Sequence, residues 1–139
     1  MVNEFLNKLN SGALLSAVNE KGEINIMTVS WGGAGILWGK QVAFVFVRPQ
    51  RHTFSFTEKG TKMSLTFFEE NEDNKKILTF CGTKSGRDID KIKACGLKYT
   101  LKLEKIYADT IKKSAFIDTE CLKWYKDDFH MMYICEIAK

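Results

Sequence analysis

Residues 42–47 (VAFVFV) form an apolar run that has no polar face. A strand with apolar side chains on both faces must be covered on both faces, so this run predicts a central strand of a sheet. The run ends at Arg48 and Pro49, and Pro49 is the only proline among the 139 residues. The chain is therefore expected to bend as soon as it leaves the core.

The bend after this strand carries Arg48 and Arg51 on either side of Pro49, with Thr53 close behind. Guanidinium groups offer paired N–H donors that match phosphate geometry, and proline restricts the conformations of the bend. Two arginines presented from a core strand therefore indicate a site for an anion. The alternative is that they solvate the strand end or pair with Glu58, which is the commoner role of such arginines in isolation.

Residues 81–91 (CGTKSGRDIDK) supply a second candidate anion site. Ser85 and Gly86 have the character of a helix start, where free backbone N–H groups favour anions. Arg87 and Lys91 add positive charge to the same stretch. The pattern also fits a capped helix start that binds nothing.

Residues 25–35 (NIMTVSWGGAG) supply a candidate surface for a flat ligand. An apolar strand here ends in small polar residues, Trp31 and glycines. A flat aromatic ligand needs backbone groups for its polar rim and small residues for close approach. The alternative is a core strand followed by a turn, with Trp31 serving only in packing.

Alternating apolar residues predict further strands, and a change to helical spacing predicts several short helices. Together they indicate a single domain over residues 1–139 that is mainly β, a β-barrel with appended helices grouped late in the chain. The glycine-rich residues 32–35 are not counted as a strand. The other expected strands are 13–18, 24–31, 63–68, 99–107 and 130–138, and the expected helices are 53–59, 73–81, one from Ser85 to a C-cap at Gly96, and one capped by Asp118.

The composition argues against several classes of protein. The chain is 45% hydrophobic and 27% charged, and its net charge of +4 comes from interspersed residues, so we expect no nucleic-acid partner. It has no run of membrane-spanning length and no signal-peptide core, which predicts a cytoplasmic protein that does not bind membranes. With two histidines, and four cysteines that form no C-x-x-C pair, we expect non-catalytic thiols and no metal site.

Taken together, these stretches resemble the flavin reductase family of FMN-binding split-barrel proteins, which includes the flavoredoxins. The resemblance runs from Gly12 to Ala138, and the order and spacing of its segments are more specific than any one segment. The matching segments are 27–33 (MTVSWGG), 38–40 (WGK), 47–53 (VRPxRxT), 81–91 (CGTxSGRDxDK) and 130–137 (HxMYIxEI).

The resemblance implies a six-stranded antiparallel split β-barrel that forms a homodimer and binds FMN near the subunit interface. It also implies a place for each matching residue. The isoalloxazine ring would lie against Met27, Thr28, Val29, Ser30 and Trp31; the phosphate would lie at Arg48, Arg51 and Thr53 on the Pro49 bend; Cys81, Gly82, Ser85, Gly86, Arg87 and Lys91 would lie close to the cofactor; and His130 would lie near the flavin edge or the nicotinamide site.

The sequence departs from the family pattern after Gly96. Relatives usually carry an extra segment with a short strand before the one expected here at 99–107, whereas this chain passes almost directly from helix to strand. The C-terminus is also short. We therefore expect a reduced wall on the substrate side, while the phosphate and ring motifs remain intact.

Two functions follow from the resemblance, and a third stays open. The first is an FMN-dependent oxidoreductase of flavin reductase type that passes electrons from NADH or NADPH to a small-molecule or protein acceptor. The second is a flavoredoxin-like electron carrier with little NAD(P)H activity of its own. The third is a split-barrel protein that uses the basic site for another anion. The sequence names neither the acceptor nor the preferred nicotinamide.

Overall fold

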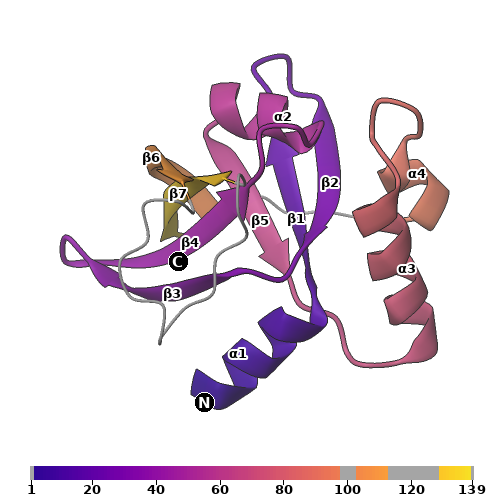
Figure 1. Ribbon diagram of the computed structural model, residues 1–139, viewed down its shortest axis with the longest axis horizontal. Coiled ribbons are helices and arrows are strands. Elements are labelled where there is room, and N and C mark those ends of the chain that lie inside the picture. The colour runs from indigo at the N-terminus through magenta and orange to yellow at the C-terminus, as the bar shows by residue number, and fades with distance from the viewer. Residues whose placement is uncertain (1, 98–102, 113–128, 139) are drawn as a thin grey trace.

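The computed structural model describes residues 2–97, 103–112 and 129–138 (Figure 1). This part of the chain contains one β-sheet and four helices. In chain order the elements are α1 (Val2–Ser11), β1 (Ala13–Val18), β2 (Ile24–Val29), β3 (Gly32–Leu37), β4 (Lys40–Val47), α2 (Thr53–Lys59), β5 (Lys62–Thr66), α3 (Glu72–Thr83), α4 (Lys91–Cys95), β6 (Leu103–Lys112) and β7 (Phe129–Ile137).

The sheet is antiparallel throughout, with the strand order β2-β1-β5-β6-β7-β4-β3. Its two edge strands, β2 and β3, follow one another in the sequence and are joined only by Ser30 and Trp31. Because so short a link connects opposite ends of the sheet, the sheet must curl until its edges meet there. The result is a barrel that is split between β2 and β3.

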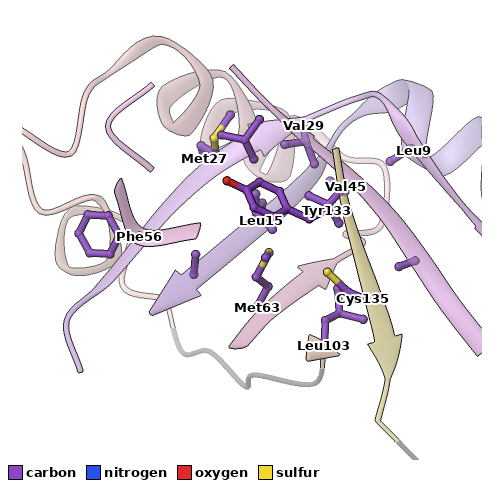
Figure 2. Close-up of a cluster of buried hydrophobic side chains, with 14 residues drawn as sticks. Leu9, Leu15, Met27, Val29, Val45, Phe56, Met63, Leu103, Tyr133 and Cys135 are labelled. Carbon is purple, nitrogen blue, oxygen red and sulfur yellow. The ribbon is translucent and has the colours of Figure 1, made fainter. Parts of the chain in front are cut away.

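The core fills the inside of this curled sheet (Figure 2). It is built from side chains such as Leu15, Val45 and Met63, which are at most 1% exposed. Residues 42–47 lie in β4, which pairs with β3 on one side and β7 on the other, so the predicted central strand is confirmed. Strand β2 is covered on both faces as expected, since Met27 packs in the barrel core and Ile26 packs under α3 with Cys81.

The prediction of six strands is wrong, because the described residues form seven. The additional strand is β3, which includes the glycine-rich residues 32–35. Glycine has low strand propensity and no side chain to pack, so the sequence gives little signal here. Pairing of residues 32–37 with β4 nevertheless holds the segment extended. The expectation that the helices would come late is also wrong, since α1 opens the chain and buries Leu9.

The helix predictions are partly confirmed. Residues 53–59 form α2, and residues 73–81 lie within α3. The helix expected from Ser85 instead begins at Lys91, because the Asp90 side chain caps it by accepting the Lys93 N–H at 3.1 Å. Its predicted end is confirmed, since Gly96 is left-handed with φ 63°. The helix expected after Asp118 lies outside the described residues.

Helices α3 and α4 lie together on the outer side of β2 (Figure 1), whereas α2 follows directly from the bend after β4. Strand β2 therefore lies between the barrel core and these helices. No helix in the described residues is long and apolar enough to cross a membrane.

Candidate functional site

Two cavities of about 290 and 270 Å³ lie next to one another and share Arg51. We call them the ring cavity and the cationic cavity. The ring cavity is lined by Met27, Thr28, Val29, Ser30, Trp31, Phe46, Arg48, Arg51 and His130. The cationic cavity is lined by Asn25, Gln50, Arg51, His52, Thr53, Lys91 and the residues from Gly82 to Arg87.

The bend after β4 is a β-turn that places Arg51 at the junction of the two cavities, whereas Arg48, expected at the phosphate, lines only the ring cavity. The Arg51 backbone N–H donates to the Arg48 carbonyl at 3.0 Å, and Pro49 occupies the second position of the turn, where its fixed φ is favoured. The Arg51 guanidinium reaches the carbonyl of Gly82 at the end of α3, 3.5 Å away. The turn thus joins the end of β4 to the 82–87 segment.

Lys91 is the most buried cation of the cationic cavity, with only 2% of its surface exposed. Its ammonium donates to the carbonyls of Cys81 at 3.0 Å and Lys84 at 3.1 Å. Burial lowers the pKa of Lys91, and the nearby Arg51 lowers it further. Burial likewise lowers the pKa of Arg51, with a smaller effect from Arg48. These groups therefore crowd positive charge into a partly dry space.

No aspartate or glutamate is among the described residues that line this cavity. Its charged lining consists of Arg51, Lys84, Arg87 and Lys91. The pKa of His52 is lowered by burial and by the charges of Arg87 and Lys91, while the nearby Asp88 carboxylate opposes this effect. An anion entering here would meet several cations in the cavity lining.

Asn25 is a cavity residue that the sequence did not single out. It lies on β2, is 6% exposed, and its Nδ2 donates to the Thr53 hydroxyl at 2.8 Å. Gly86 presses against its amide so closely that a β-carbon at Gly86 would overlap the amide oxygen. A signal was available, because Asn25 is a polar residue on the same strand face as Met27 and Val29.

The ring cavity brings together parts that are distant in the sequence. Trp31 comes from the β2–β3 link and His130 from β7, and their rings lie 5.1 Å apart at 55°. Phe46 on β4 contacts the same imidazole, with ring centroids 6.5 Å apart. The sequence did not indicate Phe46, because its role depends on the pairing of β4 with β7.

Several predicted ring contacts can be made only in part by side chains. Met27 and Val29 pack into the barrel core, so a ligand would meet mainly their backbone. The Thr28 hydroxyl donates to the Leu78 carbonyl and ties β2 to α3. Ser30 is exposed, and Trp31 is 51% exposed. The backbone of 27–31 together with the Trp31 ring therefore forms the wall that is open to a ligand.

Cys81 and Pro49 are the predicted cofactor residues that line neither cavity. The Cys81 side chain is fully buried against Leu14 and Ile26, and burial raises the pKa of its thiol to about 12. It contributes only its carbonyl, which accepts from Lys91. Pro49 contributes by restricting the conformation of the turn that carries Arg48 and Arg51. The structure brings all the other predicted cofactor residues, together with His130, to one or both cavities.

No protein-family model and no curated protein matches this sequence. The fold, by contrast, is similar to that of several solved flavin proteins. An FMN-binding protein from Thermus thermophilus is 16% identical, with 92% of this chain and 67% of that chain covered at a TM-score of 0.65. A flavoredoxin from Methanosarcina acetivorans is 18% identical, with coverage of 92% and 66% and a TM-score of 0.64.

The styrene monooxygenase flavin reductase from Pseudomonas putida S12 is 18% identical, with coverage of 92% and 76% and a TM-score of 0.56. The chain thus spans about two thirds to three quarters of the length of these three proteins. At sequence identities this low, the similarity shows a shared fold but does not show a shared activity. The chain has the split-barrel fold of these flavin proteins.

Proposed function

We propose that the two cavities bind FMN and that the chain is an FMN-dependent oxidoreductase of flavin reductase type. The observation that carries this proposal is the pairing of the cavities through Arg51. One has an aromatic wall and open backbone, and the other has four cationic side chains. A ligand that is flat at one end and anionic at the other suits both cavities at once.

The residues present fit this cofactor. A phosphate monoester carries about 1.5 to 2 negative charges at pH 7. Arg51 and Lys91 are cations held in partly desolvated positions, and the charge of the phosphate would offset their crowding. Thr53, Thr83 and Ser85 add neutral polar groups beside them. A neutral ligand would leave this charge uncompensated.

FMN, when bound, supplies hydride and electron transfer. The chain's own residues hold the cofactor and limit the access of water. Trp31 and His130, whose rings contact each other, would form one wall of the ring cavity, and Arg51 would join the ring end to the phosphate end. The described residues show no metal-binding group of His, Cys, Asp or Glu. NADH or NADPH is the electron donor in this proposal, as the resemblance of the sequence to flavin reductases implied.

An FMN-binding electron carrier with little NAD(P)H activity is the second candidate. Two flavoredoxins share the fold. Seven residues, 96–102, separate α4 from β6 in the sequence, and we expect the substrate side to lack a segment there. A reduced wall on the substrate side would weaken nicotinamide binding while leaving the phosphate and ring contacts in place.

The absorbance spectrum of the purified protein, loaded with FMN and kept without oxygen, separates these functions. Bleaching of the flavin band within seconds of adding NADH or NADPH would support the reductase. A bound flavin that is bleached by dithionite but not by either nicotinamide would favour the carrier. Failure to retain or bind FMN would contradict both and leave the basic site to another anion.

A further inference from the structure

The hydrogen bond between Asn25 and Thr53 determines what the cationic cavity offers to a ligand. Both residues line that cavity, and both side chains are buried. The Asn25 amide nitrogen donates to the Thr53 hydroxyl oxygen at 2.8 Å. An amide N–H cannot accept, so the hydroxyl is the acceptor of this bond.

A hydroxyl group has a single hydrogen, and here that hydrogen is left over. Thr53 accepts from Asn25, and no acceptor for its O–H is found in residues 2–97, 103–112 and 129–138. A buried donor without a partner costs free energy. An anion in the cavity would provide the missing acceptor.

The orientation of the Asn25 amide follows from its other neighbour. The amide oxygen faces Gly86, whose backbone comes so close that a β-carbon would overlap that oxygen. A carbonyl oxygen tolerates the hydrogens of a glycine α-carbon, whereas an NH₂ group would press its own hydrogens against them. The nitrogen is therefore directed at Thr53.

We propose that Asn25 is a positioning and specificity-determining residue for the phosphate of FMN, because it directs the Thr53 hydroxyl hydrogen toward the ligand and keeps the cavity free of negative charge. This inference rests on the proposed function. Asn25 acts on the phosphate end of the cofactor and leaves the ring cavity unchanged. It is the amide, in place of an isosteric carboxylate, that makes the site selective for an anion.

Asn25→Asp tests this inference because aspartate has nearly the same shape. Its carboxylate would accept the Thr53 hydrogen, which reverses that bond, and would place a negative charge near Arg51 and Lys91. We expect FMN to bind at least about tenfold more weakly, because the Thr53 hydroxyl no longer donates to the charged phosphate. Riboflavin has no phosphate, so its affinity should change by less than about threefold. The flavin-free variant should melt no lower than the native protein, because its new charge has cations beside it.

The matched control is Asn71→Asp, which makes the same change at the exposed N-cap of α3. Aspartate also caps helices well, so binding of both flavins should stay at the native level. The dissociation constants of FMN and riboflavin are measured by fluorescence quenching at one ionic strength. Equal weakening of both flavins by Asn25→Asp, or no weakening of FMN, would overturn the inference.

Thr53→Val provides the second arm, alone and combined with Asn25→Asp. In the native background it should weaken FMN and spare riboflavin. In the Asn25→Asp background it should cost less FMN affinity, because the hydroxyl already donates to the carboxylate. Fully additive losses would overturn the inference.

Should Asn25→Asp fail to fold, Asn25→Ala should give a smaller loss that is still confined to FMN, and a loss shared with riboflavin would overturn the inference. A native protein that binds FMN no more tightly than riboflavin would overturn the phosphate assignment itself, and this inference with it.

Discussion

Burial changes the pKa values of two thiols and two cationic side chains in this protein. Burial raises the pKa of Cys81 and that of Cys135 to about 12, so neither is a thiolate at neutral pH. Burial lowers the pKa of Arg51 and of Lys91, which means that their charged forms are destabilised. A bound anion would stabilise these charged forms. Neither of these two thiols is therefore suited to thiolate chemistry at neutral pH, whereas the two cations suit the binding of an anion.

The Cys135 thiol gives a pH-dependent prediction. Its pKa is near 9 in the unfolded chain and about 12 when folded, so between these values the folded state holds the extra proton. The stability that Cys135 contributes is complete below about pH 9 and declines as the pH rises toward 12. The stability advantage of the native protein over Cys135→Ala should be about 1 kcal/mol at pH 7 and shrink by pH 10.5. Urea denaturation at pH 7, 9 and 10.5 measures it, and an advantage that does not change with pH would contradict this account.

Residues near one another in the sequence were the ones that sequence reasoning placed correctly. Arg48 and Arg51 could be assigned to one turn because proline and their spacing define it. The role of Asn25 depends on Thr53, which is 28 residues away, and on the close approach of Gly86. The burial of Lys91 depends on carbonyls at the end of α3, so the sequence indicated its charge but not its confinement.

At the scale of elements, strand pairing and helix capping determine element boundaries that the propensities of the residues do not predict. Strand β3 forms on glycines because β4 supplies a partner, and α4 starts at Lys91 because Asp90 caps it. The same scale explains how α2 is held. Its last turn is fixed by Lys105 on β6, whose ammonium donates to the carbonyls of Thr57 at 2.7 Å and Glu58 at 2.8 Å. These contacts fix the helix that begins with Thr53.

A second tie to α2 comes from Tyr133 on β7 and gives an element-scale prediction. Its hydroxyl, buried in the core, lies 2.9 Å from the Thr57 hydroxyl and donates to the Glu58 carboxylate at 3.0 Å (Figure 2 shows the ring in the core). Tyr133→Phe should lower the free energy of unfolding by about 0.5–1.5 kcal/mol, because Thr57 keeps the Phe54 carbonyl as an alternative acceptor and Glu58 is exposed to water.

Urea denaturation measures that loss, and an FMN titration of the folded variant serves as its control. FMN affinity should stay at the native level, since neither cavity is touched. A variant as stable as the native protein would show that the bond to α2 contributes nothing.

At the scale of the whole molecule, several large apolar side chains are left exposed on the surface. Ile36 is 71% exposed and Trp38 is 61% exposed on the β3–β4 hairpin, which extends away from the body in Figure 1. Trp31 and Tyr107 are also large exposed hydrophobic residues, and the Trp38 and Tyr107 rings contact each other at 6.2 Å. Exposed apolar surface, such as that of the paired Trp38 and Tyr107 rings, is typical of protein interfaces.

We propose that this surface forms the interface of a homodimer, as the resemblance to split-barrel proteins implied. Sedimentation of the native protein at micromolar concentration should give a dimer, and Ile36→Glu should shift it toward the monomer by placing a charge in the interface. Leu6→Glu on α1 is the control, since Leu6 is also exposed, at 48%, and its change should leave the dimer intact. A native protein that sediments as a clean monomer would contradict the proposal.

The central claim is that the cationic cavity holds the phosphate of FMN, and the most direct test compares FMN with riboflavin. Both flavins are titrated into the native protein and into Arg51→Ala by fluorescence quenching, at low and at physiological salt. The account predicts that Arg51→Ala weakens FMN by roughly tenfold to a hundredfold, as expected for a charge-assisted hydrogen bond, while riboflavin changes little. Native FMN binding should also weaken as salt rises, because the charges act through partly wet surroundings. Equal losses for the two flavins, or no loss for either, would contradict the account.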